Sequence, residues 1–185
     1  MKKEKALKYF SEGRLCYDKH QDKKAEELMK KAIDEDANFA EPHVIIAILC
    51  LEQNRMKERV FHLSEAIRKA PQLYTENYFN LAETEFDLAD YDHAKQHYQQ
   101  FLKFPKVNPE DRDEAVFKLQ CVDFSVEARK HPLNINYRNM GIAINSQFSE
   151  YFPSIVANES AFLFTRRLPS EYGEQEDLFL AKRTS

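Results

Sequence analysis

Residues 25–37 read AEELMKKAIDEDA, and residues 59–71, which begin 34 positions later, read RVFHLSEAIRKAP. Six pairs of similar or equivalent residues keep this interval: Gly13 and Ala47, Cys16 and Cys50, Met29 and Leu63, Ala32 and Ala66, Ile33 and Ile67, and Ala37 and Pro71. A constant interval of this length is typical of a repeating pair of antiparallel helices. The two stretches therefore predict equivalent second helices in two successive copies of such a pair.

A third copy follows at an interval of 35 residues. The pairs that keep it are Ile46 and Leu81, Ala47 and Ala82, Leu63 and Tyr98, and Ala66 and Phe101. We therefore expect six helices, with one extra residue in the turn around Leu73 and Tyr74. Because one such pair cannot bury its apolar face alone, stacked copies form a superhelix whose concave side is a binding surface.

Each copy repeats an order of aromatic, small, large, small, large and small residues. The first copy shows it as Tyr9, Gly13, Cys16, Ala25, Met29 and Ala32, and the third fits it well with Tyr78, Leu81, Ala82, Ala94, Tyr98 and Phe101. Over residues 5–105 this pattern resembles the tetratricopeptide repeat (TPR) family, which implies a mainly α fold of three helical hairpins. The second copy departs from it, with His43 at the aromatic site and Arg59 at a small-residue site.

The stretch after the third copy predicts a capping helix. Asn108 and Pro109 suit the N-cap and first position of a helix, which we expect to run to about residues 131–132. Two apolar stripes lie on opposite faces of it: Ala115, Leu119, Val122 and Val126, and then Phe117, Cys121, Phe124 and Ala128. We expect the first stripe to cap the third repeat and residues 133–165 to cover the second.

Strand-forming residues replace the helical pattern after Pro132. Residues 153–165 predict two short strands joined by a turn at Asn158 and Glu159, and residues 178–181 predict a third. Five segments, NMG at 139–141, INS at 144–146, EYFPSI at 150–155, FLFTRR at 162–167 and QEDLF at 175–179, resemble the start of a propeller in Bacteroidetes envelope proteins. In that group, TPR repeats precede a WD-repeat-like (TolB-like) β-propeller and an OmpA-like peptidoglycan-binding domain.

The two resemblances imply two domains. Residues 1–131 would form the repeats with the capping helix, and residues 132–185 an extended linker and the first strands of a truncated propeller. Since a propeller needs at least four blades and about one is present, we expect a fragment of a longer chain; the alternative is a complete small protein whose tail forms a hairpin on the capping helix. Unpaired strand edges also predict a possible homodimer through this β segment.

Composition and motifs exclude several function classes. With 27 basic and 31 acidic residues, the net charge of -4 is too balanced for a nucleic-acid partner, and no apolar run reaches the ~20 residues of a membrane span. Cys16, Cys50 and Cys121 include no CxxC motif and are expected as free thiols. The spacing of His93 and His97 is only a weak metal signal, and we expect both on a solvated helix face. We predict a non-enzymatic protein without a cofactor.

The TPR resemblance implies a peptide-binding groove lined by the first helix of each repeat. Its predicted residues are Phe10, Arg14, Tyr17, Val44, Ile48, Leu51, Phe79, Glu83 and Phe86, with an acidic rim of Glu41, Glu52, Glu76 and Asp87. Repeats that clamp the carboxylate of chaperone tails carry Lys and Asn where Phe10 and Arg14 stand here, which argues against such tails. An apolar floor with an acidic rim instead favours a segment rich in aliphatic and basic residues.

Three functions are compatible with these observations. The second resemblance implies an interaction scaffold on the periplasmic side of the outer membrane, in an outer-membrane or peptidoglycan-associated assembly. The first alternative is a cytosolic peptide-binding TPR adaptor. The second is the leader region of a propeller-containing hydrolase. The start, MKKEKALKYF, has no apolar run of the kind an intact signal peptide needs.

Overall fold

The computed structural model describes residues 2–156, 158–171 and 173–183. The chain divides into two compact units, Met1–Pro132 and Leu133–Ser185, which we call the helical unit and the β unit. We describe each unit by itself. None of the helices in the described part of the chain combines the length and the apolar composition that a bilayer span requires.

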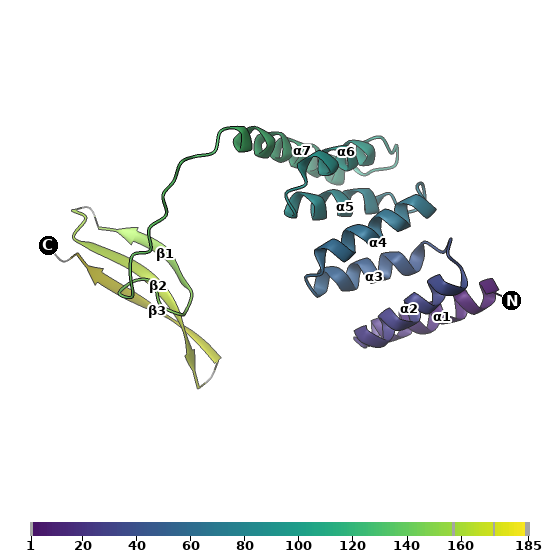
Figure 1. Ribbon diagram of the computed structural model, residues 1–185, viewed down its shortest axis with the longest axis horizontal. Coiled ribbons are helices and arrows are strands. Elements are labelled where there is room, and N and C mark those ends of the chain that lie inside the picture. The colour runs from purple at the N-terminus through teal and green to yellow at the C-terminus, as the bar shows by residue number, and fades with distance from the viewer. Residues whose placement is uncertain (1, 157, 172, 184–185) are drawn as a thin grey trace. The chain divides into compact units, whose positions relative to one another are not determined.

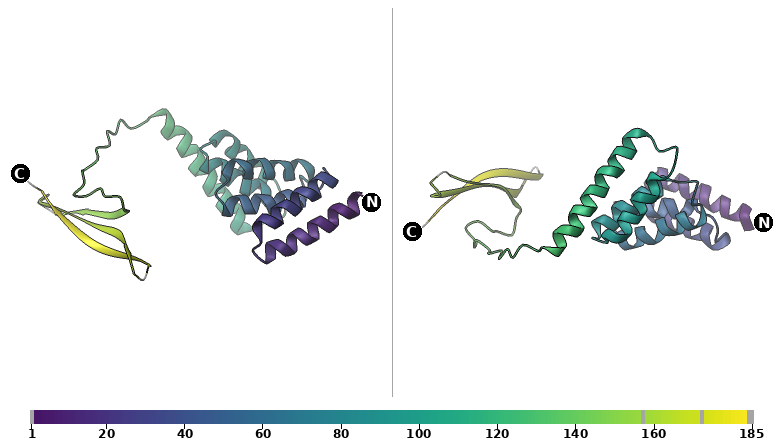
Figure 2. Two further views of the ribbon diagram at one scale, coloured as in Figure 1. Left: turned by 60° about the horizontal axis from the view of Figure 1, so that its bottom comes forward. Right: turned by 90° about the horizontal axis from the view of Figure 1, so that it is seen from above.

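The helical unit is a mainly α array of three helical hairpins followed by a longer helix, as the repeats predict (Figure 1). The helices are α1 (Lys2–Asp18), α2 (Asp22–Glu35), α3 (Glu41–Glu52), α4 (Met56–Lys69), α5 (Glu76–Asp87), α6 (Tyr91–Leu102) and α7 (Pro109–Lys130). Each helix packs against the next one along the chain, and Figure 2 shows this stack from two further sides. The core is therefore built from contacts between neighbours in sequence.

The connections between hairpins confirm the position of the extra residue. Residues 36–40 join α2 to α3, and residues 70–75 join α4 to α5. The second connection is one residue longer, and it contains Leu73 and Tyr74. The interval of 35 residues thus arises in a turn, where an insertion leaves the packed helices unchanged.

The turn inside each hairpin has the same geometry in all three copies. His20, Asn54 and Ala89 have positive φ angles of 54°, 56° and 59°. The next amide donates to the carbonyl oxygen five residues back: Gln21 to Cys16, Arg55 to Cys50 and Asp90 to Glu85, at 2.7–2.9 Å. These are the hydrogen bonds of a Schellman motif, which satisfies the last carbonyls of each first helix.

Small residues let the paired helices approach closely. Ala25, Ala32, Ala66 and Ala94 are fully buried. A Cβ atom at Gly13 would lie 3.0 Å from the Met29 side chain and 3.1 Å from Leu28 Cβ. The backbones of α1 and α2 can therefore come closer than an alanine would allow.

Arg59 is accommodated at its small-residue site by partial burial. Its Nε atom is buried without a hydrogen-bond partner among the described residues. Burial lowers the pKa of the guanidinium, and the negative charges of Asp87 and Glu83 act in the opposite direction. The second repeat therefore buries part of a charged side chain at the position where the other two repeats have Ala25 and Ala94.

His43, at the aromatic site of the second repeat, is also buried, and it pairs with a second histidine. Its Nδ1 atom lies 3.0 Å from Nδ1 of His62 on α4, and both side chains are at most 9% exposed. At this distance one Nδ1–H group donates to the other Nδ1 atom, so the accepting imidazole must be neutral. Burial and the neighbouring imidazole lower the pKa of His43 to about 4, and burial also lowers that of His62.

The capping helix α7 begins as predicted. The Asn108 side chain accepts a hydrogen bond from the Asp111 amide at 2.8 Å, and Pro109 is the first helical residue. Ala115 and Val122 are buried against the third repeat, with Leu119 and Val126 half-buried beside them. The first stripe therefore caps the array.

The second stripe of α7 has no cover from the described part of the helical unit. Phe117 is 60% exposed and Phe124 is 75% exposed. The expectation that residues 133–165 cover this face stays a prediction.

The β unit begins with an extended stretch and contains one antiparallel sheet with the strand order β1-β2-β3. Its strands are β1 (Glu150–Ile155), β2 (Ala161–Ser170) and β3 (Gly173–Lys182). Asn158 and Glu159 lie in the turn between β1 and β2, as expected, and Glu159 has a positive φ of 56°. A register shift between Tyr151 and Ser154 places Pro153 in a bulge, where the ladder needs no proline amide.

The second and third strands are longer than the sequence predicts. β2 extends five residues beyond Thr165, and β3 begins at Gly173 instead of Leu178. Both extensions belong to one hairpin, in which Arg167 pairs with Glu176 and Ser170 with Gly173. The sequence did not predict this part of the hairpin because it lacks the apolar alternation of a strand. Cross-strand ion pairs of Arg167 with Glu174 and Glu176 are present there instead.

Candidate functional site

The first helices of repeats one and two form a pocket of about 280 Å³, which we call the α1–α3 pocket. It is lined by Phe10, Arg14, Tyr17 and Asp18 from α1, Glu41, Val44, Ile45 and Ile48 from α3, and Tyr74 from the α4–α5 connection. The aromatic rings and the aliphatic side chains make its walls largely apolar. A site of this kind takes an apolar side chain and fixes it with few polar contacts.

The polar groups around the α1–α3 pocket are mostly acidic. Arg14 is the one basic lining residue, against the carboxylates of Asp18 and Glu41. The Tyr17 hydroxyl donates to Glu52 at 3.5 Å. Burial, and to a smaller extent the Glu52 carboxylate, raise the pKa of Tyr17. Burial and Glu41 raise the pKa of Tyr74 in the same way. Both hydroxyls therefore stay protonated, and each already has a carboxylate as its acceptor.

A second, smaller pocket of about 130 Å³ lies at the other end of the array and is named here the α5–α7 pocket. Its lining residues are Glu76, Phe79 and Asn80 from α5, Phe101 from α6, and Asp111 and Glu114 from α7. Three carboxylates, those of Glu76, Asp111 and Glu114, surround the two aromatic rings. The described lining contains no basic residue, so this pocket favours a cation.

The structure brings together five of the nine predicted groove residues. Phe10, Arg14, Tyr17, Val44 and Ile48 line the α1–α3 pocket. Leu51, one turn further along α3, is 43% exposed and lies outside the lining of both pockets. Whether any of these residues binds a ligand stays a prediction.

The three predicted residues of the third repeat make internal contacts. Phe79 packs against Tyr98 and Phe101, with ring centroids 5.5 and 5.4 Å away, although it also lines the α5–α7 pocket. Glu83 accepts hydrogen bonds from the Tyr98 hydroxyl and, at 2.8 Å, from Lys118. Phe86 packs against Tyr91 at 5.4 Å. These side chains therefore stabilise the junction of α5, α6 and α7.

Seven lining residues are missing from the groove and rim predicted from the sequence: Asp18, Ile45 and Tyr74 in the first pocket, and Asn80, Phe101, Asp111 and Glu114 in the second. Tyr74 belongs to the connection that carries the extra residue, so the repeat pattern gives it no equivalent. Asp111 and Glu114 lie on the capping helix, outside the three copies. At both places the sequence departs from the repeat pattern, and this departure is the signal that could have indicated these lining residues.

The described residues contain no group of three or more His, Cys, Asp or Glu side chains that could hold a metal ion. His93 Nδ1 is 2.8 Å from Asp90, and His97 Nδ1 is 2.6 Å from Glu85. His97 is thus partly buried and hydrogen-bonded to Glu85, whereas we expected it on a solvated helix face. Cys16, Cys50 and Cys121 are free thiols.

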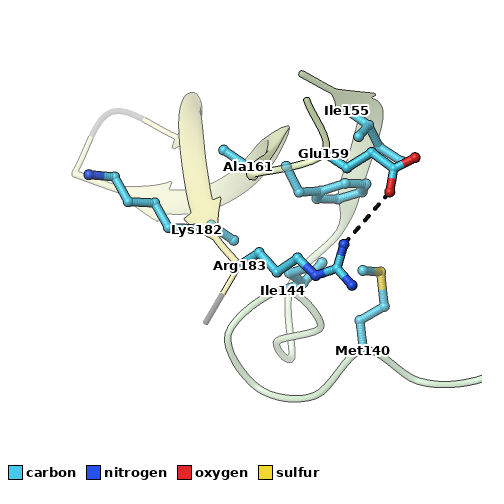
Figure 3. A pocket seen from close by; sticks show the side chains of 9 residues that line it. Met140, Ile144, Ile155, Glu159, Ala161, Lys182 and Arg183 are labelled. Atoms are coloured by element: carbon cyan, nitrogen blue, oxygen red, sulfur yellow. Dashed lines mark ion pairs between the residues drawn. The ribbon is translucent and has the colours of Figure 1, made fainter. Parts of the chain in front are cut away.

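Two of the other cavities among the described residues also have apolar lining. One of about 440 Å³ surrounds the histidine pair and includes Phe61, Arg68 and Lys69. The other, of about 380 Å³, lies in the β unit, where Met140 and Ile144 line it together with Ala161 and Lys182 of the sheet (Figure 3). Neither has the combination of apolar walls and first-helix lining seen in the α1–α3 pocket.

Comparisons with known proteins agree with this architecture. Residues 75–107 match the family model for the tetratricopeptide repeat. A search of curated protein sequences found no match. The helical unit therefore has the fold of a TPR array, and its third repeat carries the family's sequence pattern.

Solved TPR structures resemble the chain at low sequence identity. The first TPR of Spaghetti (RPAP3) bound to the HSP90 peptide SRMEEVD has 18% identity and a TM-score of 0.57, covering 68% of this chain and 95% of its own. The second TPR domain of human RPAP3, in complex with the HSP70 peptide SGPTIEEVD, has 18% identity and a TM-score of 0.56, covering 66% and 98%.

A bacterial structure is similar to the same degree. The Yersinia enterocolitica type III secretion chaperone SycD, in complex with a peptide of the translocator YopD, has 10% identity and a TM-score of 0.55, covering 65% of this chain and 93% of its own. These identities establish the fold alone. None of the comparisons supports a propeller or an OmpA-like domain.

Proposed function

We propose that this chain is a non-enzymatic, peptide-binding TPR adaptor whose partner combines aliphatic and basic residues. The observation that carries the proposal is the α1–α3 pocket, with its apolar walls and acidic rim. TPR domains of similar fold bind peptides of HSP90, HSP70 and YopD, which supports a peptide as the ligand class.

The charges favour a basic partner over an acidic one. Five carboxylates, those of Asp18, Glu41, Glu76, Asp111 and Glu114, line the two pockets against the single guanidinium of Arg14. The chaperone peptides SRMEEVD and SGPTIEEVD carry two glutamates and an aspartate near their ends. Such a segment would place like charges together in this groove, which disfavours binding.

A pair of matched peptides tests this charge preference. Both would carry the same aliphatic residues, flanked by lysines in one and by glutamates in the other, and fluorescence anisotropy would measure the dissociation constants. We expect the lysine peptide to bind at least about tenfold more tightly at low salt, with the difference shrinking as salt screens the charges. Equal affinities would contradict the proposal.

The position of the site can be tested with two variants of one helix. Ile48→Ala removes three carbon atoms from the α1–α3 pocket and should weaken the lysine peptide by about 1 kcal/mol, or about fivefold. Leu51→Ala is the matched control, since Leu51 is an exposed aliphatic residue of α3 outside the pocket lining. Equal losses in both variants would place the peptide elsewhere.

The second resemblance favours another candidate, an interaction scaffold on the periplasmic side of the outer membrane. A three-stranded antiparallel sheet over residues 150–182 is compatible with the start of a propeller blade. Fractionation of cells expressing the complete reading frame tests it. Recovery with the outer-membrane fraction would support this candidate, whereas recovery only in the cytosol would contradict it and leave the cytosolic adaptor.

A further inference from the structure

One face of the β-unit sheet is covered within the unit. Phe164 is 2% exposed and stacks on Phe179, with ring centroids 5.7 Å apart. The guanidinium of Arg166 lies over Phe179 and donates to the carbonyl of Ile144 at 3.0 Å. The segment around Ile144 therefore closes this face, as Figure 3 shows at one end of the sheet.

The opposite face lacks such a cover among the described residues of the unit. Strand pairing places Leu163 opposite Leu180 and Thr165 opposite Leu178, so these side chains share one face. Leu178 is 73% exposed and Leu180 is 56% exposed. Two adjacent leucines on the outermost strand thus form an apolar patch next to a free strand edge.

The backbone amides and carbonyls along the outer edge of β3 belong to these same residues. The Arg183 amide donates to Ser160 of the neighbouring chain segment at 2.9 Å, in register with the β2–β3 ladder. Because alternate residues of an antiparallel strand bond to opposite sides, the odd-numbered residues of β3 bond to β2. The outward-pointing amides and carbonyls therefore belong to the even-numbered residues, including Glu176, Leu178, Leu180 and Lys182.

The β3 edge is complementary to a second copy of itself. If two β3 strands run antiparallel with Phe179 opposite its counterpart, each Leu178 faces the other copy's Leu180, and each Glu176 faces the other copy's Lys182. The leucine pairs and the Glu176–Lys182 pairs all join even-numbered residues. The outward-pointing amides and carbonyls of the two copies therefore lie opposite one another. A shift to Leu178 opposite itself leaves only one leucine pair and sets Glu176 against Leu180, which makes it the poorer register.

We propose that two copies of this chain form a homodimer by antiparallel pairing of their β3 strands, centred on Phe179. The joined sheet would gather Leu178 and Leu180 of both copies into one apolar strip. Two Glu176–Lys182 pairs would flank it. Figure 3 shows Lys182 directed away from the Glu159–Arg183 ion pair. Within one copy, Glu176 accepts a hydrogen bond from Arg167. The Arg167 guanidinium also lies 3.4 Å from the Glu174 carboxylate.

Charge exchange across the pair tests both the surface and the register. Sedimentation equilibrium of the full chain would measure dimerisation from low-micromolar to sub-millimolar concentration. Glu176→Lys and Lys182→Glu should each weaken the dimer about tenfold, because each turns two attractive pairs into two repulsive ones. The double variant restores opposite charges in both pairs and should recover most of the affinity.

A matched control separates the two registers. Glu174→Lys makes the same charge change on the same face, but Glu174 faces Lys182 only in the shifted register, so we expect a much smaller effect. A chain that stays monomeric throughout the concentration range would overturn the proposal. So would a double variant as weak as the single ones, or a dimer that resists both Glu176→Lys and Lys182→Glu and is broken by Phe124→Ser on α7.

Discussion

The helical unit and the β unit differ in how each element is covered. In the helical unit every helix packs against the next one along the chain, and residues such as Met29, Ile46 and Leu81 are at most 1% exposed. Among the described residues of the β unit, only Phe164 is buried. Three strands with one apolar face are about the minimum for an independently stable sheet. Repetition therefore gives each helix a core from its neighbours along the chain, whereas the sheet buries little apolar surface.

The largest expected effect breaks the core of the helical unit. Leu81→Ala leaves a cavity beside Ala47 and Leu63 and should lower the free energy of unfolding by about 2–5 kcal/mol. Leu178→Ala, its counterpart in the β unit, should cost less than about 0.5 kcal/mol in the monomer because the side chain is exposed. Urea unfolding followed by helical circular dichroism measures the first loss, and hydrogen exchange of the β2–β3 amides measures the second. Similar losses would contradict the comparison.

The second prediction concerns pH and the histidine pair of the second repeat. The pKa of His43 is about 4 in the folded chain, against an ordinary value of 6.5, so the unfolded chain binds more protons between these values. Stability is then fully present above pH 6.5 and lost as the pH falls, by about 2 kcal/mol at pH 5. Thermal unfolding of the wild type between pH 7.5 and 5 should show this decrease.

Charged side chains surround the histidine pair. Those nearest His43 are Glu65, Arg68 and Lys69, and those nearest His62 include Lys30, Glu26, Glu58 and Arg55. Hydrogen bonds to Arg68 and Lys69 lower the pKa of Glu65 to about 2, and, although burial acts in the opposite direction, hydrogen bonds to Lys30 and Arg55 lower that of Glu26. His43→Phe should flatten the slope above pH 5, and an unchanged slope would show that the pair is not responsible.

A third change tests the register of the repeats. Ala66 is fully buried, and Ala66→Leu should overpack the second hairpin and lower the free energy of unfolding by about 1–3 kcal/mol. Ser64→Leu is the control, since Ser64 is exposed on the same helix. An unchanged melting temperature for the Ala66 variant would refute the predicted register.

The smallest expected effect is a gain of stability in the repeated turn. Ala89 has a φ of 59°, a conformation that costs an alanine about 1 kcal/mol more than a glycine. Ala89→Gly should therefore raise the free energy of unfolding by up to about 1 kcal/mol, whereas Asn54→Gly should change it little because asparagine tolerates this conformation. A loss of stability in the Ala89 variant would show that its Cβ atom contributes more than the strain removes.

Regular repetition explains how much of the fold the sequence predicts. A single interval places Ala32, Ala66 and Cys50 in the core, because equivalent helices pack in equivalent ways. The His43–His62 contact was not predictable in this way, since it joins two unrelated positions across the α3–α4 interface. The β unit has no internal repeat, and the ends of β2 and β3 were missed there.

The candidate site follows the same rule. Phe10 and Ile48 line the α1–α3 pocket, as expected for side chains on the first helices of two successive repeats. Phe86 contacts Tyr91 instead, since the last repeat uses its first helix to hold the cap as well as to face solvent. A position in the repeat thus predicts burial better than it predicts contact with a ligand.

The Schellman turns also provide one equivalent reporter in each repeat. The amides of Gln21, Arg55 and Asp90 occupy matching positions and donate to matching carbonyls, so their hydrogen exchange with solvent follows the opening of three comparable hairpins. In a linear array, opening is coupled mainly to the adjacent repeats. The three exchange rates, measured together by NMR, would therefore give the free energy of fraying from each end and the strength of coupling between neighbouring repeats.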